Sequence, residues 1–384
     1  MSSSPVPLAV LDLAPVVSGG TAAQALRNTI DLAKHTEQFG YRRYWLAEHH
    51  LVPGVAASSP PVLTALVASA TSTIRVGSAA VLLGNHSPLV VAEQFGTVAQ
   101  VYPNRIDVGL GRAGLGRSKD FVKRFAEPEA ESAATRDRIV EGLLVPGRPT
   151  ARINVENVID RLSAQQRLIG DRGEDASDYD TDVRRVLGFF EGTYREPDGT
   201  EHHSVTAEGA DVEFWIFGSS AGPSSAVAGS LGLWFGANYH VSPSTVIETA
   251  AAYRDAFKPS KYLDRPYVSV SADVVVAEDD ATAKELASGY GQWVASIRSG
   301  RQGAIQYPTP AEAAQYTWTD DQRASVADRT RTQFVGSPQR VADGLATLRD
   351  AVNADEIVVT TITHEHADRV RSYELLAKAW ADLA

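Results

Sequence analysis

The sequence contains no cysteine and only one methionine. Without cysteine the protein has no disulfide scaffold, no thiolate zinc site, no iron–sulfur cluster and no cysteine nucleophile. A membrane-spanning helix needs about 18 consecutive apolar residues, and no stretch of the sequence approaches that length. Positive charge is also scarce, because 36 Lys and Arg residues stand against 47 Asp and Glu residues, a net charge of −11. This balance argues against a nucleic acid or an anionic membrane surface as partner.

The 384 residues are 43% hydrophobic, which is enough for a sizeable core and excludes a disordered chain. The first residues, Met1 to Pro5, carry no basic side chain and precede no long apolar stretch, so they do not resemble a signal peptide. We therefore expect a cytoplasmic protein.

Short apolar segments alternate with amphipathic helical segments along most of the chain. The predicted buried strands cover residues 7–14, 41–47, 74–83, 105–110, 214–218, 234–239, 268–277 and 356–362. The predicted helices cover residues 21–39, 60–70, 88–102, 224–233, 243–257, 279–297, 337–351 and 367–383. Strands separated by single helices pair in parallel, and eight such units predict a single (β/α)8 TIM barrel domain over residues 1–384. A doubly wound open sheet is the alternative.

Two segments depart from this alternation and are expected to be insertions. The first, at about residues 118–210, is charge-rich, with helical pieces around residues 136–144, 155–168 and 182–190 and no strong strand. The second, at about residues 300–328, is expected to be rich in loops.

Polar residues follow several of the predicted strands, where the chemistry of such barrels is found. Six of the nine histidines lie on these loops. His49 and His50 directly follow the second strand, so one of them suits a general base or a hydrogen-bond donor to a developing anion, unless it only packs in the rim. His364 and His366 form a pair that suits a metal hydrolase, but helix capping and solvation explain the pair more simply, and no metal site is predicted.

The fourth and fifth strands end in small and basic residues. Residues 109–114 match G-x-G-x-x-G, but a dinucleotide fingerprint comes first in its unit and opens a hydrophobic helix. The run is therefore either a turn that needs glycine, or a place where Arg112 and nearby amides face a ligand anion. The serines of Gly218-Ser219-Ser220 offer hydroxyl and N–H donors, although an ordinary helix cap is the alternative. Together, Arg112 and this turn suggest a phosphate site.

These motifs, in this order, resemble the luciferase-like flavin monooxygenases, in the branch with Ala-Glu-His-His and Gly-Ser-Ser motifs. The resemblance runs from about residue 8 to residue 377, except parts of the two insertions. It rests on YWLAEHH at residues 44–50, IRVGSAA at 74–80, NHSPLVVAEQF at 85–95, RIDVGLGR at 105–112, FGSS at 217–220 and RSYELLA at 371–377.

The resemblance implies a barrel that dimerises and binds reduced FMN supplied by a separate flavin reductase. A flavin (hydro)peroxide formed with O₂ would then oxygenate a small-molecule substrate. By motif, His49 matches the catalytic histidine, and Ala79-Ala80 matches a pair joined by a cis peptide under the flavin ring. The implied phosphate contacts are Arg112 and the turn Gly218-Ser219-Ser220, and Tyr239 is expected to line the flavin cavity. An F420-dependent oxidoreductase and a non-catalytic flavin-binding protein are the alternatives.

Overall fold

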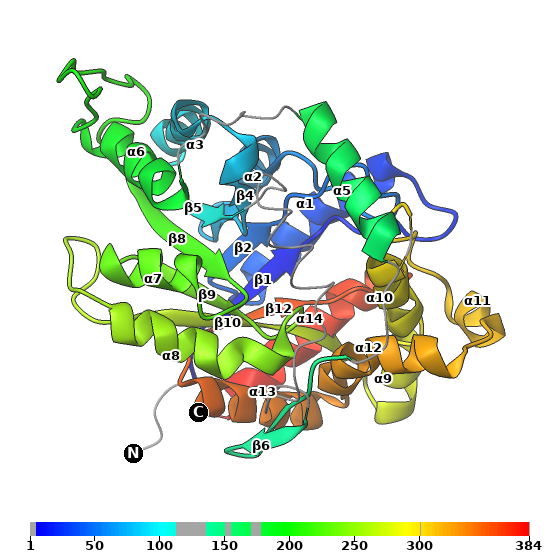
Figure 1. Ribbon diagram of the computed structural model, residues 1–384. Helices are drawn as coiled ribbons and strands as arrows, with labels where there is room; N and C mark the ends of the chain where they lie inside the picture. Colours follow the sequence, from blue (N-terminus) through cyan, green and yellow to red (C-terminus); the bar gives the residue numbers. More distant parts are fainter. Residues whose placement is uncertain (1–4, 113–135, 150–154, 170–177, 300, 384) are drawn as a thin grey trace.

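The structure is a computed structural model that describes residues 5–112, 136–149, 155–169, 178–299 and 301–383. Within these residues, eight parallel strands form a closed ring, and helices surround it (Figure 1). The ring closes because the last strand pairs with both the first and the seventh. Its strands are β1 (Leu8–Asp12), β2 (Arg43–Leu46), β3 (Arg75–Ser78), β5 (Ile106–Gly111), β8 (Val212–Gly218), β9 (Trp234–Asn238), β10 (Val268–Val276) and β12 (Glu356–Thr360). The predicted (β/α)8 barrel is confirmed, and the open sheet is excluded.

Each predicted strand and most predicted helices are present. The helices between strands are α1 (Ala22–Gln38), α2 (Pro60–Ala70), α3 (Pro88–Val101), α7 (Pro223–Ser230), α8 (Val246–Ala256), α13 (Pro338–Val352) and α14 (His366–Ala381). The predicted strand at residues 74–83 is divided, because β4 (Val81–Leu82) follows β3 after an interruption and pairs with β5. The predicted helix at residues 279–297 is also divided, into α9 (Asp280–Leu286) and α10 (Tyr290–Ser299).

A buried charge cluster occupies the N-terminal ends of the barrel strands. Arg43 donates to Asp107 at 2.6 Å, Glu213 at 2.8 Å and Glu356 at 3.1 Å. Its guanidinium also lies 4.9 Å from the ring centre of Trp215, which fills the barrel interior. Because a buried charge is stable only when it is paired, this cluster holds four strands together at the end away from the chemistry.

The two insertions contain more regular structure than predicted. A hairpin of β6 (Arg138–Val140) and β7 (Leu143–Val145) stands where a helix was predicted, so that prediction is wrong. The other two predicted helices of the first insertion are confirmed as α5 (Val155–Ile169) and α6 (Tyr179–Glu191). The second insertion is not loop-rich, because it forms α11 (Pro310–Gln315) and α12 (Asp320–Thr332), followed by the short strand β11 (Phe334–Gly336) beside β10.

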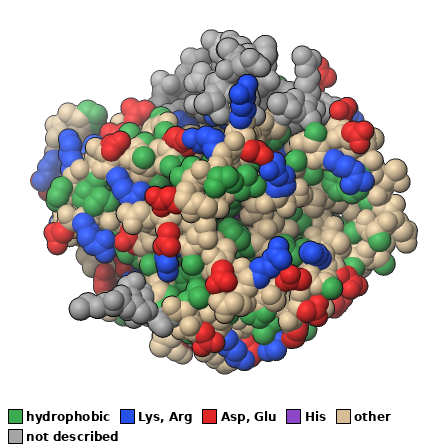
Figure 2. All heavy atoms as spheres, turned by 90° about the horizontal axis from the view of Figure 1, so that it is seen from below, with side chains coloured by type: hydrophobic (Ala, Val, Ile, Leu, Met, Phe, Trp, Pro, Cys, Tyr) green, Lys and Arg blue, Asp and Glu red, His purple; other side chains and the backbone are tan. Residues whose placement is uncertain are grey.

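Ion pairs attach the hairpin to the barrel helix α8 and to α12 of the second insertion. Arg138 pairs with Glu248 of α8 at 2.7 Å, and Asp137, just before β6, pairs with Arg331 of α12 at 2.6 Å. Acidic and basic side chains are interspersed on the face seen from below in Figure 2. None of the helices among the described residues is long and apolar enough to cross a membrane.

Candidate functional site

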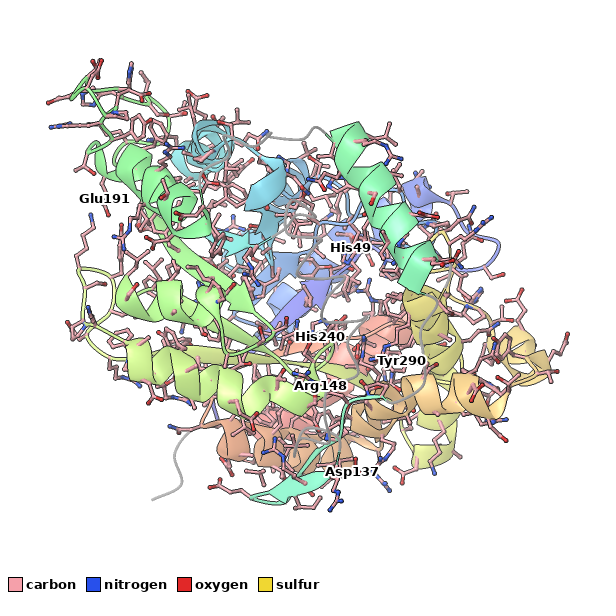
Figure 3. All side chains as sticks on the ribbon, viewed as in Figure 1. His49, Asp137, Arg148, Glu191, His240 and Tyr290 are labelled. Carbon is pink, nitrogen blue, oxygen red and sulfur yellow. The ribbon has the colours of Figure 1, made fainter. Side chains whose placement is uncertain are left out.

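A cavity of about 460 Å³ lies at the C-terminal ends of the barrel strands. His49, three residues beyond β2, and Arg112, directly after β5, both line it. Figure 3 shows His49 between the strands of the barrel and α5. The structure therefore brings the predicted catalytic histidine and the predicted phosphate-binding arginine to one cavity, at the end of the barrel where such sites are found.

Glu48 joins the loops that follow β2 and β3. Its Oε1 accepts hydrogen bonds from the Nε2 atoms of His50 and His86, each at 2.8 Å, and its Oε2 accepts one from the Leu82 amide at 2.9 Å. Burial by itself would raise the pKa of Glu48, but the hydrogen bonds from the two imidazoles outweigh it and lower the pKa to about 2. Glu48 is thus ionised, and both of its oxygens are occupied. Neither Glu48 nor His86 was assigned a role from the sequence.

His49 lies next to Glu48 in the chain but takes no part in the hydrogen bonds of the Glu48 carboxylate. Its backbone amide donates to the Ala57 carbonyl at 2.8 Å, and among the described residues its imidazole has no hydrogen bond. The exposed surface of the side chain belongs to the wall of the cavity. Burial lowers the pKa of His49 to about 4, although the Glu48 carboxylate acts in the opposite direction. A neutral imidazole facing a cavity can accept a proton or donate one hydrogen bond to a ligand.

The strand register places the predicted phosphate-binding residues side by side. The β5–β8 pairing ends at Gly111 opposite Phe217, so Arg112 and Gly218 are neighbours one residue further on. Ser219 is exposed and Ser220 half-buried, just before α7. The turn itself does not line the cavity, whereas Arg112 does.

The glycines of the G-x-G-x-x-G run belong to β5 rather than to a turn, so the interpretation as a turn is wrong for Gly109 and Gly111. A Cβ at Gly109 would lie 1.7 Å from the Ser78 carbonyl oxygen. Glycine is therefore needed here because the backbones of β3 and β5 approach closely. Gly114 lies outside the described residues.

The Ala79-Ala80 peptide bond, between β3 and β4, is cis, as the resemblance implies. Ala80 packs against the end of β5, where a Cβ at Gly111 would lie 2.9 Å from the Ala80 Cβ. Tyr239 is not brought to the cavity. Its hydroxyl donates to the Leu144 carbonyl at 2.6 Å, and the side chain is buried.

His240 lies two residues beyond β9 and does not itself line the cavity. Its Nδ1 lies 2.7 Å from the Ser271 hydroxyl. Burial, together with the Arg329 charge and the nearby His49, lowers the pKa of His240 to about 3. Behind it, Arg329 donates to the Tyr290 hydroxyl at 3.0 Å and to Asp273 at 3.2 Å, and Figure 3 shows His240 and Tyr290 on the same side of the molecule.

Helix α5 of the first insertion forms one wall of the cavity. Residues 161, 162, 165, 166 and 169 of this helix line it, and Trp293 and Ile297 of α10, which contacts α5, form the adjoining part of the wall. These five positions recur at the helical period, so they lie on one face of α5. In the sequence, that spacing is the signal that this face of the helix points into the cavity.

The two histidines after β12 bond to different carboxylates. His366 bonds to Asp31 of α1 at 2.8 Å, and His364 bonds to Glu365 at 2.8 Å. Over the described ranges, no group of three or more His, Asp or Glu side chains is placed to hold a metal ion.

The family model for luciferase-like monooxygenases matches residues 6–145 and 171–354. The chain is 37% identical to the uncharacterized protein YvbT of Bacillus subtilis over 376 residues, which cover 97% of this chain and 96% of YvbT. It is 31% identical to a luciferase-like monooxygenase of Escherichia coli over 375 residues, which cover 98% of this chain and 97% of that one.

Solved structures show the same fold. Apo-MsnO8 matches with a TM-score of 0.72 and 27% identity over 99% of both chains. The oxygenating constituent of 3,6-diketocamphane monooxygenase of Pseudomonas putida, in complex with FMN, matches with a TM-score of 0.66 and 17% identity over 98% of both chains. An F420-dependent secondary alcohol dehydrogenase matches with a TM-score of 0.59 and 12% identity over 98% of this chain and 99% of that one. With its barrel, its cavity and a family match over most of its length, this chain belongs to the luciferase-like monooxygenases.

Proposed function

We propose that the protein is an FMN-dependent monooxygenase that oxygenates a small organic substrate with O₂. The observation that carries the proposal is the position of Arg112, which lines the cavity beside His49 and also neighbours the Gly218 turn by strand register. A flavin phosphate needs cationic and N–H donors, while its ring needs a mostly apolar cavity.

The residues at this end of the barrel suit FMN. Arg112 offers a planar guanidinium, and Ser219 and Ser220 add two hydroxyls beside the start of α7. The one carboxylate among the described cavity-lining residues, that of Glu48, is already bonded to His50, His86 and Leu82, so it does not compete for these donors. When bound, reduced FMN would supply the electrons for oxygen activation.

His49 acts on a proton or on developing negative charge near the reacting atoms. Its lowered pKa keeps the imidazole neutral at pH 7, so one ring nitrogen can take up a proton and the other can donate. The walls from α5 and α10 limit the access of water to the reaction.

An F420-dependent oxidoreductase is the second candidate, because an F420-dependent dehydrogenase shares the fold over nearly the whole chain. The motifs around His49 and Gly218 favour FMN. The test is anaerobic titration with reduced FMN and with reduced F420, followed by addition of O₂. We expect tight binding of reduced FMN and a flavin absorbance transient that needs O₂. Binding of F420 alone, with hydride transfer in the absence of O₂, would reject the proposal.

We further propose that the protein works as a homodimer with a separate flavin reductase. Helices α2 and α3, which pack together, expose a set of apolar side chains: Val62, Leu66, Leu89 and Val90. Exposed apolar surface of this kind suits contact with a second copy. Leu66→Arg is expected to shift the sedimentation coefficient to that of a monomer, and an unchanged coefficient would reject this interface.

A further inference from the structure

We propose that Gln165 of α5 is a positioning residue for His49, and that it acts by holding the backbone carbonyl of His50. The inference rests on the proposed function, because it concerns how the His49 imidazole is presented to the reaction. It draws on the bonds of the loop that carries His49, on the backbone conformation of Leu51, and on the attachment of α5 to the rest of the molecule.

The loop at residues 47–57 carries His49 and is bonded at several points. The His49 amide donates to the Ala57 carbonyl at 2.8 Å, so the two halves of the loop are joined to each other. The Gly54 amide donates to the Ala304 carbonyl at 2.8 Å, which joins the loop to the second insertion. These bonds fix the second half of the loop and the amide of His49 itself.

The peptide that joins His50 to Leu51 has a conformation that must be held in place. Leu51 has a φ of 56°, in the left-handed region that favours glycine. Its side chain is 60% exposed, so packing of that side chain does not hold the conformation. A backbone in this region persists only where the surrounding structure fixes it.

Gln165 supplies a bond at this peptide. Its Nε2 donates to the His50 carbonyl, which belongs to the same peptide unit as the Leu51 amide. His49 therefore lies between an amide bonded to Ala57 and a peptide bonded to α5. Together, these two bonds set the direction in which the His49 imidazole faces the cavity.

Helix α5 is itself fixed, so it can serve as a support. Asn157 Nδ2 donates to the Ser299 carbonyl at 3.2 Å, and Arg161 Nη2 donates to the Ile297 carbonyl at 3.2 Å, both at the C-terminal end of α10. Gln165 is one turn further along the same face of α5, which passes beside His49 in Figure 3. A reacting group is held precisely when the side chains that support it stand on such anchored elements.

Gln165 also lines the cavity, so the experiment must separate its bond to the loop from a role in the lining. Gln165→Met keeps the shape and removes the donor, Gln165→Glu replaces the donor with an acceptor, and Gln165→Lys keeps a donor. Gln166→Met is the matched control, because Gln166 also lines the cavity and, within the described residues, is not bonded to the loop. Leu51→Asn tests the conformation of the peptide, since Asn adopts a left-handed φ more readily than Leu.

Hydrogen–deuterium exchange on the full chain, read by mass spectrometry, compares residues 47–57 with α1. We expect Gln165→Met and Gln165→Glu to speed exchange of the His49 amide about fivefold, the factor that one net hydrogen bond represents, while exchange in α1 is unchanged. Gln165→Lys and Gln166→Met should exchange like the wild type. Adding Leu51→Asn to Gln165→Met should restore part of the protection.

The His49 imidazole gives a second readout. In protein with ¹⁵N-labelled histidine, the His49 signals are assigned by their loss in His49→Ala. Gln165→Met should shift or broaden these signals and leave those of the exposed His203 in place. With reduced FMN bound, Gln165→Met should change the rate of reoxidation by O₂ in the same direction as His49→Ala, and by a smaller factor.

Unchanged exchange at residues 47–57 in the donor-free variants, or equally faster exchange in Gln166→Met, would overturn the inference. So would faster exchange with unchanged His49 signals, because Gln165 would then hold the loop without positioning the imidazole. Gln165→Glu keeps the test decisive if Gln165→Met does not fold.

Reduced-FMN titration of the same variants tests the proposed function separately. Binding of FMN with an unchanged loop rejects only the role of Gln165. A loop whose order depends on Gln165, in a protein that does not bind FMN, rejects only the FMN proposal.

Discussion

His240 should make the protein sensitive to acid, and the size of the effect follows from its surroundings. Its pKa is about 3 in the folded protein, chiefly because of burial, against about 6.5 for an unfolded chain. Below pH 6.5 the unfolded chain therefore takes up a proton that the folded protein does not accept until about pH 3. Stability present above pH 6.5 is lost as the pH falls, at about 1.4 kcal/mol per pH unit, which amounts to about 2 kcal/mol at pH 5.

The test replaces His240 with Asn, whose side-chain amide can either donate to or accept from the Ser271 hydroxyl that Nδ1 now faces. Urea unfolding at pH 7, 6 and 5 gives the free energy of unfolding of each variant. Between pH 7 and pH 5, His240→Asn should lose about 2 kcal/mol less than the wild type. His203→Asn is the control, because His203 is exposed and Glu208 raises its pKa, so its removal should not reduce acid sensitivity. Equal losses in His240→Asn and the wild type would refute the reasoning.

Four further substitutions test the site and the barrel. His49→Ala should leave FMN affinity nearly unchanged and lower turnover about 10²–10⁴-fold in steady-state assays, the usual contribution of a proton-transfer group; an unchanged rate would remove its role. Arg112→Ala should weaken FMN far more than riboflavin in fluorescence titrations, because only FMN carries the phosphate, and equal losses would contradict the phosphate assignment. Arg43→Met should lower the free energy of unfolding by about 3–5 kcal/mol, since it removes the ion-pair partner of the buried Glu356 and leaves Asp107 and Glu213 with Arg75 alone; a loss below 1 kcal/mol in urea would argue against the cluster. Gly109→Ala should prevent soluble expression, because the new Cβ would meet the Ser78 carbonyl, and a soluble variant with wild-type thermal stability would disprove that close approach.

The barrel was predictable because its strands are locally marked. Each is a short apolar run bounded by turn residues, and Thr21 caps α1 as its sequence position indicates. The prediction failed in the insertions for a different reason. The hairpin depends on a two-residue turn at Glu141 and Gly142, which both have positive φ, and a glutamate in the first position, instead of the common Asn, Asp or Gly, hides the usual signal.

The helices of the second insertion were missed although their start signals are present. Thr309 with Glu312, and Thr319 with Gln322, form capping boxes. Helix α12 is mostly polar, so its hydrophobic pattern is too weak to stand out.

The candidate site was predictable only where local sequence determines it. His49 lies three residues beyond its strand and Arg112 directly after its own, so the fold places both at one end of the barrel. The bonds of Glu48, the surroundings of His240 and the wall formed by α5 depend on residues far apart in the chain, and one sequence contains no record of such pairings.

The carboxylate shared by His50 and His86 couples the loops that follow β2 and β3 energetically. Because both imidazoles bond to one oxygen of Glu48, loss of either imidazole changes the strength of the hydrogen bond that the other makes. The changes in stability or activity caused by substitutions at these two positions are therefore expected to be non-additive. Variant libraries that change one loop alone miss combinations that are favourable only when both loops change.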